Sequence, residues 1–149
     1  MEMFDSNDCS LMIQPEEEAL QRRCIAAIIQ GVDEFEQANG QDDNNRPLIL
    51  AVLHRDGEVV AGLLGKLLRG WLQVDMLWVA ESLRGRGYGA GLMQRAEAIA
   101  IDEGCRSVHL ETYSFQAPDF YKKLGYEVFG ALEEYPPGET KYYFRKQLG

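Results

Sequence analysis

Cysteines, long apolar runs and basic termini are all scarce in this chain of 149 residues, and each scarcity excludes a class of protein. The three cysteines, at positions 9, 24 and 105, lie far apart and in no metal-ligand spacing. They predict neither a disulfide scaffold nor a metal site, and favour reduced thiols in the cytoplasm. No long uncharged apolar run is present, so a membrane span is not expected. The acidic start, residues 1–5, differs from the basic start of a signal peptide.

Positive charge is also in deficit. Lysine and arginine number 15 against 24 aspartates and glutamates, which gives a net charge of −9. An acidic surface repels nucleic acid, so no nucleic-acid partner is predicted. The same surface attracts cations, although solubility alone accounts for the composition equally well.

The patterning predicts one α/β domain over residues 1–149, with residues 1–9 peripheral. Apolar residues at helical spacing follow Pro15, and turn signals such as Asp56-Gly57 and Arg69-Gly70 separate three consecutive apolar strands. A strand, a glycine-rich loop, a helix and another strand then require a crossover, which makes those two strands parallel. The expected strands are 10–14, 48–53, 59–64, 71–79, 107–112, 126–129 and 141–145, and the expected helices start at 15, after the glycine-rich loop and at 118.

That loop is the most informative stretch. Glycines stand at 85, 87, 89 and 91, beside Arg84 and Arg86. Glycine lets main-chain N–H groups approach a ligand closely, and the following helix directs its positive end to the same place. Together with the arginines this predicts a phosphate-binding site.

Several loop types have to be compared. A P-loop is excluded because Gly-Lys-Ser/Thr is missing after the glycines. The relaxed dinucleotide pattern Gly85-x-Gly87-x-x-Ala90 is present, with Glu111 at a suitable distance for a ribose carboxylate, but too little chain follows for repeated strand–helix units. A glycine-rich turn that only caps a helix remains a further alternative.

The pattern Arg84-x-x-Gly87-x-Gly89 resembles the pyrophosphate loop of the Gcn5-related N-acetyltransferase (GNAT) family. A second segment, Phe120-Tyr121-Lys122-Lys123-Leu124-Gly125-Tyr126, is similar to the family's Tyr-Glu-Lys-Leu-Gly-Phe signature. The order of the expected elements also matches. Two positions depart from the family pattern, because Ser114 stands where the family often has Asn and Glu81 where it often has Pro.

The resemblance implies a single-domain GNAT-type fold, in which a mixed, mostly antiparallel sheet flanked by helices splays between strands 71–79 and 107–112. It implies acetyl-coenzyme A as co-substrate and direct attack of a primary amine on the thioester. The acceptor would be a small cationic amine or a protein amine. The residues expected to hold the coenzyme are Leu77, Trp78, Val79, Arg84, Gly85, Arg86, Gly87, Tyr88, Gly89, Ser114 and Tyr121.

Three residues are candidates for catalysis. The resemblance makes Tyr121 the acid that protonates the departing thiolate. Strand alternation places Gln73, Asp75, Leu77 and Val79 on one face, so Asp75 is a candidate base, with Glu111 its counterpart on the next strand. Burial would raise the pKa of either carboxylate toward a useful range. A base acting through water is an alternative.

Other functions stay open on the sequence. A module that binds acetyl-coenzyme A without turnover, and a small Rossmann-type nucleotide protein, share the glycine loop. The acidic, aromatic segment Glu133–Pro137 would lie beside the acceptor mouth in a GNAT-type fold and is a candidate for selecting a cation. Late edge strands are compatible with a homodimer.

Overall fold

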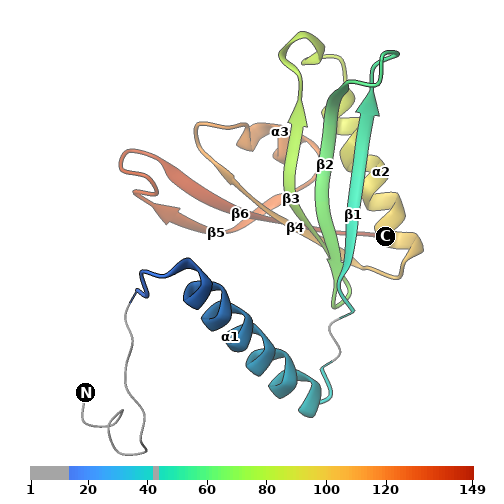
Figure 1. Ribbon diagram of the computed structural model, residues 1–149. Coiled ribbons are helices and arrows are strands. Elements are labelled where there is room, and N and C mark those ends of the chain that lie inside the picture. The colour runs from blue at the N-terminus through green and yellow to red at the C-terminus, as the bar shows by residue number, and fades with distance from the viewer. Residues whose placement is uncertain (1–13, 42–43) are drawn as a thin grey trace, which may run out of the picture. The chain divides into compact units, whose positions relative to one another are not determined.

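The computed structural model describes residues 14–41 and 44–149 (Figure 1). The predicted peripheral segment 1–9 lies outside the described residues, as does all of the predicted strand 10–14 except Gln14. The chain divides into two units, Met1–Asp43 and Asn44–Gly149. The single domain therefore stays a prediction. Among residues 14–41 and 44–149, no helix has both the length and the apolar character needed to cross a membrane.

The first unit contains α1, an uninterrupted helix over Glu18–Ala38. It begins three residues after Pro15, and Glu18 lies in the first turn, where the helix dipole favours a carboxylate. The predicted apolar stripe includes Ile28, Val32 and Phe35 along this helix. Gly31 does not break the helix, because one glycine costs only about 1 kcal/mol relative to alanine.

The second unit is built on a six-stranded sheet with the strand order β1-β2-β3-β4-β6-β5. All neighbours are antiparallel except β3 and β4, which are parallel. The predicted meander and the predicted parallel pair are therefore confirmed. The strands are β1 Arg46–Leu53, β2 Val59–Leu68, β3 Trp71–Val79, β4 Ser107–Tyr113, β5 Glu127–Glu133 and β6 Thr140–Gln147.

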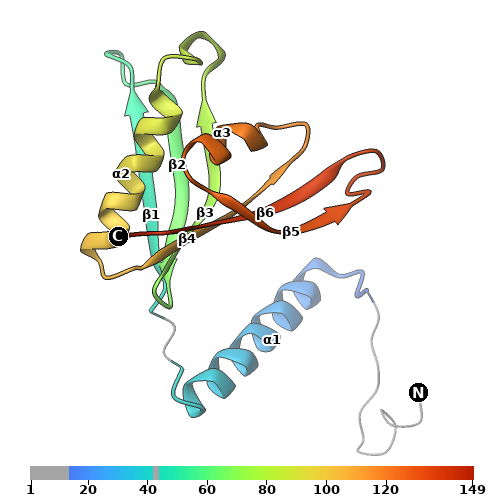
Figure 2. The same cartoon turned by 180° about the vertical axis from the view of Figure 1, so that it is seen from behind.

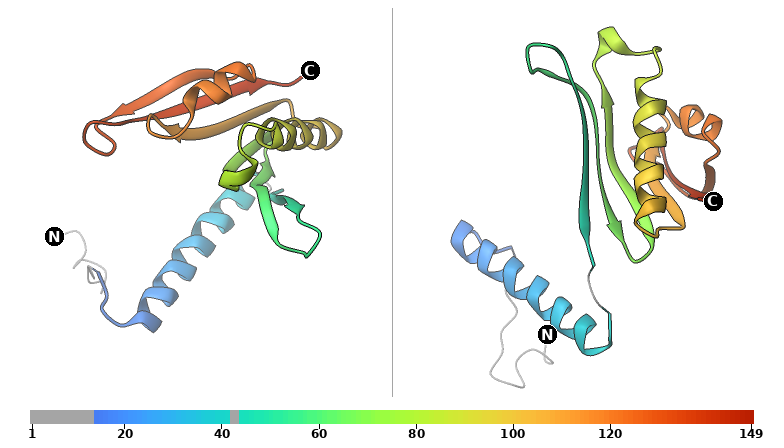
Figure 3. Two further views of the ribbon diagram at one scale, coloured as in Figure 1. Left: turned by 90° about the horizontal axis from the view of Figure 1, so that it is seen from above. Right: turned by 90° about the vertical axis from the view of Figure 1, so that its right-hand side faces the viewer.

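Two helices cover one face of this sheet. After β3 the chain passes through a short 3-10 turn, η2 Glu81–Leu83, and the glycine loop into α2, Tyr88–Asp102. A third helix, α3 Pro118–Lys123, follows β4. Figures 1 and 2, which view the sheet from opposite sides, agree that α2 and α3 lie on the same face, and Figure 3 shows α2 running along β1–β3. The fully buried core includes Leu63, Leu72, Met93, Val108 and Phe144.

The pairing of β2 with β3 contains an irregularity that matters for the site. Leu64 pairs with Met76 and the next residue, Gly65, pairs with Val74, so Asp75 is an extra residue in β3. Such a bulge shifts the alternation of side chains by one. Gly65 permits it, because a Cβ atom there would lie 2.5 Å from the carbonyl oxygen of Gln73. No side chain other than hydrogen fits opposite this bulge.

Candidate active site

The two parallel strands separate partway along their length. Pairing between β3 and β4 runs from Trp71 with Ser107 to Val74 with Leu110, the last pair formed. Beyond that point β4 continues to pair with β6 on its other side, while β3 continues to pair with β2. The predicted splay between these strands is thus present, and it turns the β4-facing edge of residues 75–79 toward open space.

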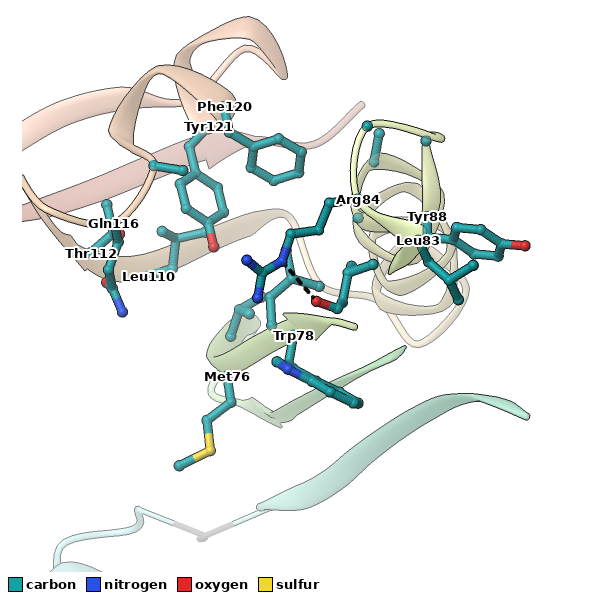
Figure 4. Close-up of a pocket in the computed structure, with 18 of the residues that line it drawn as sticks. Met76, Trp78, Leu83, Arg84, Tyr88, Leu110, Thr112, Gln116, Phe120 and Tyr121 are labelled. Atoms are coloured by element: carbon teal, nitrogen blue, oxygen red, sulfur yellow. Dashed lines mark hydrogen bonds between the residues drawn. The ribbon is translucent and has the colours of Figure 1, made fainter. Parts of the chain in front are cut away.

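A cavity of about 870 Å³ fills this gap. Its lining comes from the end of β3, the glycine loop, the start of α2, the end of β4 and the segment leading into α3 (Figure 4). Eleven of the thirteen residues predicted for the site line it: Asp75, Leu77, Trp78, Val79, Arg84, Gly85, Gly87, Tyr88, Gly89, Glu111 and Tyr121. Most of the residues predicted for the site therefore line the same cavity.

The glycine loop forms one end of the cavity. Gly85 and Gly87 have φ angles of 73° and 87°, in the left-handed region that side chains with a Cβ rarely adopt. Gly87 is the N-cap residue of α2, and its carbonyl accepts the N–H of Gly91 at 2.9 Å. The first N–H groups of a helix lack intrahelical partners and carry the positive end of its dipole. This end of the cavity therefore suits an anion held by main-chain groups.

Gly89 has a different task, because it lets α2 approach α3. A Cβ at this position would lie 3.2 Å from Cζ of Phe120 and 3.9 Å from Cγ2 of Val79. The first contact is tighter than ordinary van der Waals packing. Gly89, the third glycine of the loop, thus allows the two helices to meet at the wall of the cavity.

The two arginines of the loop line different hollows. The side chain of Arg84 folds into the cavity, where its Nε donates a hydrogen bond to the carbonyl oxygen of Val79 at 3.1 Å (Figure 4). Arg86 does not line this cavity; it lines a neighbouring hollow of about 420 Å³ together with Arg95 and Tyr88. The expected pair of cations beside one phosphate group is therefore split between two hollows.

Tyr121 projects from α3 into the cavity. Its ring packs edge-on against Phe120 and Tyr126, with centroids 5.0 Å and 6.0 Å away, and lies 5.9 Å from the ring of Phe144. Figure 4 shows the hydroxyl directed toward the centre of the cavity. Burial raises the pKa of Tyr121 above its usual value. The phenol is therefore protonated at neutral pH and able to donate a proton.

Asp75 lies where the bulge puts it, and two expectations about it are wrong. The predicted shared face of Gln73, Asp75, Leu77 and Val79 is interrupted, because Asp75 is the extra residue of β3. The carboxylate is exposed to solvent rather than buried. Its partner is the side-chain amide of Gln73, which donates to it at 2.7 Å. Asp75 nevertheless lines the cavity.

Glu111 also lines the cavity, and it forms an ion pair with Lys141 of β6. Half of its side chain is exposed, so the burial expected for this carboxylate is also wrong. The hydrogen bond to Glu111 raises the pKa of Lys141. The ammonium of Lys141 lies 5.1 Å from the ring centroid of Tyr135 and 5.3 Å from that of Tyr143, within the range of cation–π attraction.

Ser114, the residue at the family's Asn position, does not line the cavity. Its hydroxyl donates a hydrogen bond to the carboxylate of Glu139 and accepts one from the backbone N–H of Thr140 at 2.9 Å. Its own backbone N–H donates to the carbonyl of Thr140 at 2.8 Å. Ser114 therefore ties the turn after β4 to the start of β6.

Residues that sequence reasoning missed complete the lining. They are Val74, Met76, Leu83, Ala90, Leu110, Thr112, Phe115, Gln116, Ala117 and Phe120. Most follow from the splay, since any residue at the open ends of β3 and β4 must line the gap between them. Phe115 and Gln116 could have been found as the residues between a strand that ends at the gap and the helix that carries Tyr121.

Comparison with known proteins agrees with this geometry. Residues 11–126 match the acetyltransferase (GNAT) family. The chain is 45% identical to blasticidin-S acetyltransferase from Streptomyces morookaense over 93 residues. This aligned region covers 62% of this chain and 68% of that protein. The crystal structure of an acetyltransferase from Bacillus cereus superposes with a TM-score of 0.77 at 32% identity, covering 93% of this chain and 98% of that one.

An aminoglycoside 6'-N-acetyltransferase solved with coenzyme A shares the fold, with a TM-score of 0.61 at 18% identity over 68% of this chain and 72% of that one. The match over residues 11–126 covers most of the chain, and it includes both the glycine loop and the Tyr121 segment. The predicted fold and the predicted class of enzyme are confirmed. The chain belongs to the acetyltransferase (GNAT) family.

Proposed function

We propose that this protein transfers an acetyl group from acetyl-coenzyme A to a primary amine, and that the acceptor is a small cationic molecule. The observation that carries the proposal is the end of β3–β4 pairing at Val74 and Leu110, with main-chain donors at one end of the resulting cavity and the Tyr121 phenol inside it. A relative that is named blasticidin-S acetyltransferase supports a small acceptor.

The donor would lie along the length of the cavity. The β4-facing edge of residues 75–79 offers backbone N–H and C=O groups, which would bind the amides of the pantetheine arm as an added strand does. The N–H groups of residues 85–89 would bind the diphosphate. Arg84 would exchange its bond to the Val79 carbonyl for a contact with this anion, because a charged acceptor binds guanidinium more strongly than a neutral carbonyl does.

The protein has three roles in the reaction: it positions the acceptor amine, accepts a proton from the ammonium and donates a proton to the sulfur. The acceptor amine must lie against the thioester carbon, so that the new C–N bond forms as the C–S bond breaks. The ammonium must first lose a proton, to Asp75, to Glu111 or to a water between them, because only the neutral amine has a lone pair. Tyr121 then donates its proton to the departing sulfur, so that coenzyme A leaves as the thiol, and the second proton, which the nitrogen loses as the amide forms, returns the Tyr121 phenolate to the phenol.

Charge at the acceptor end favours a cation. Glu111 is paired with Lys141, but Asp75 is hydrogen-bonded by a neutral amide. Among the contacts of the described residues, the carboxylate of Asp75 therefore has no ion pair with a cation of the protein, unlike that of Glu111. A positively charged acceptor would supply that cation, and its proton has a nearby acceptor.

Two measurements test the proposal. Isothermal titration calorimetry with acetyl-coenzyme A and with coenzyme A should give one binding site per chain. The release of the coenzyme A thiol from acetyl-coenzyme A is then measured with each amine of a panel. We expect amine-dependent release of thiol. Tight binding of acetyl-coenzyme A with no release for any amine would instead favour a module that senses the coenzyme, and no binding would remove the donor from the scheme.

A further inference from the structure

Three aromatic rings are stacked in parallel, and the first of them, Phe115, lines the cavity. The rings of Phe115 and Tyr113 lie 5.0 Å apart between centroids with 13° between their planes. The rings of Tyr113 and Tyr135 lie 6.1 Å apart with 6° between their planes. The first two rings come from the end of β4 and the turn after it, and the third comes from the β5–β6 connection.

The turn that carries Phe115 is held from two directions. The side-chain oxygen of Gln116 accepts hydrogen bonds from the Thr112 hydroxyl at 2.9 Å and from the backbone N–H of Tyr113 at 3.0 Å. On the other side, Ser114 is bonded to Glu139 and Thr140. A ring on a turn with this many bonds is presented in a fixed orientation, which lowers the entropy cost of binding against it.

Phe115 is the end of the stack that reaches the cavity. It lines the cavity, whereas Tyr113 and Tyr135 do not. One face of its ring is covered by Tyr113, yet 58% of the residue is exposed. A large apolar side chain left this open, inside a cavity and on a rigid turn, offers a flat binding surface rather than a packing element.

Negative charge lies in the same cavity. Asp75 and Glu111 both line it, and Glu111 already has the ammonium of Lys141 as its partner. A ligand that used both features would need a flat ring for Phe115 and a cationic nitrogen for the carboxylate of Asp75. Neither a plain polyamine nor an uncharged aromatic molecule has both.

We infer that the acceptor is an amine that carries a flat aromatic or heteroaromatic ring, and that this ring stacks on the open face of Phe115 and continues the Phe115–Tyr113–Tyr135 stack. The inference rests on the proposed function, because it names the acceptor for the same cavity. Phe115 is in this view a specificity residue that binds the part of the acceptor remote from the reacting nitrogen.

A matched pair of amines separates stacking from simple apolar burial. In 2-phenylethylamine and 2-cyclohexylethylamine the nitrogen is equally far from a six-membered ring, but only the first ring is flat. The cyclohexyl ring is the more apolar of the two, so a surface that binds by apolar burial alone should bind the cyclohexyl compound more tightly. Binding of each amine to the protein saturated with coenzyme A is measured by ligand-detected NMR. We expect the phenyl compound to bind about threefold to tenfold more tightly, as aromatic pairs do beyond their area.

Three variants locate the effect. The ratio to follow is the dissociation constant of the cyclohexyl compound divided by that of the phenyl compound, which should exceed one in the parent. Phe115→Leu should bring this ratio to about one, while Phe115→Tyr should keep it. Phe129→Leu is the matched control, since Phe129 is also an exposed phenylalanine, packs against Tyr143 and does not line the cavity. It should keep the ratio of the parent.

A ratio of one or below in the parent protein overturns the inference, and so does a preference that survives in Phe115→Leu. A separate measurement tests the proposed function, namely thiol release from acetyl-coenzyme A in the presence of either amine. Thiol release with both amines and no preference in binding removes only the aromatic acceptor. A binding preference controlled by Phe115 with no thiol release from any amine removes only the transferase.

Discussion

The two ends of the cavity are built from different parts of the polypeptide. The proposed donor end consists of main chain: the free edge of β3, the glycines at 85 and 87 with positive φ, and the first turn of α2. The proposed acceptor end would use side chains that line the cavity, with Asp75 and Glu111 as its carboxylates and Phe115 as its open ring. The phenol of Tyr121 is directed toward the centre of the cavity (Figure 4).

This difference has a chemical reason. A diphosphate and a chain of amides are satisfied by backbone N–H and C=O groups, which every sequence possesses once the backbone has the correct conformation. An acceptor is recognised by its shape and charge, which only side chains can match. Substitutions at the two ends should therefore affect different constants, and the following variants test that separation.

Tyr121→Phe should have the largest effect, lowering kcat by about 100-fold, the lower range for removal of a general acid. Coenzyme binding should stay within about twofold, because the ring and its packing are retained. Because burial raises the pKa of Tyr121 above its usual value, the phenol stays protonated between pH 6 and 9, and the loss should be constant over that range. Stopped-flow thiol detection against pH measures it.

Tyr88→Phe is the control for that variant. Tyr88 also lines the cavity, but Figure 4 shows its hydroxyl pointing away from the centre. It should keep the kcat of the parent. If both variants behave like the parent, the thiolate leaves without help from a phenol.

Gly87→Val tests the main-chain end. A residue with a branched Cβ in the left-handed region costs on the order of 1–2 kcal/mol, so the loop changes conformation or the helix cap is strained. We expect coenzyme A to bind about tenfold more weakly, with kcat at saturation nearly unchanged. Titration calorimetry and steady-state kinetics give the two numbers.

Gly91→Ala is its matched control. Gly91 belongs to the same run, but it lies within α2 and a Cβ there would meet nothing within 4 Å. Its coenzyme affinity should equal that of the parent. Equal losses in both variants would show that the run is needed for flexibility as a whole, rather than for the conformation at residue 87.

Arg84→Met asks how much a side chain adds at the main-chain end. The guanidinium is bonded to the Val79 carbonyl, so binding the coenzyme breaks one hydrogen bond as it forms others. We expect a loss of about threefold for coenzyme A, typical of an exposed charge pair, and no loss for pantetheine, which has no phosphate. A loss of 100-fold for coenzyme A would make the side chain, and not the loop backbone, the main anchor.

Lys141→Met should have the smallest effect, on stability rather than on binding of the coenzyme. The bond to Glu111 raises the pKa of Lys141 above its unfolded value. The stabilisation is therefore complete below the unfolded pKa, near 10.5, and is lost as the pH rises through the folded pKa. Thermal unfolding at pH 7–9 should show a lower midpoint than the parent, a difference that shrinks only above about pH 10.5. A deficit that already disappears near pH 8 would contradict the assigned ion pair.

The same division explains what could be read from the sequence. The meander, the crossover and the conformation of residues 85–89 follow from turn residues, glycines and apolar periodicity, which act locally. Asp75 was misplaced because alternation assumes a regular strand, and the bulge depends on Gly65, a residue of the neighbouring strand. Phe115 was missed for a similar reason, since its stack joins residues that are twenty positions apart in the chain.

Because of the bulge in β3, the lining of the cavity depends on the number of residues in this strand. Between Val74 and Met76 the strand holds one residue more than β2 does, and this single addition turns Leu77 and Val79 toward the side that Leu72 and Val74 occupy. Deleting any one residue here would restore regular pairing and reverse the orientation of every side chain that follows. Insertions in the hairpin at Asp56 change only a loop, whereas the length of β3 is fixed to the residue.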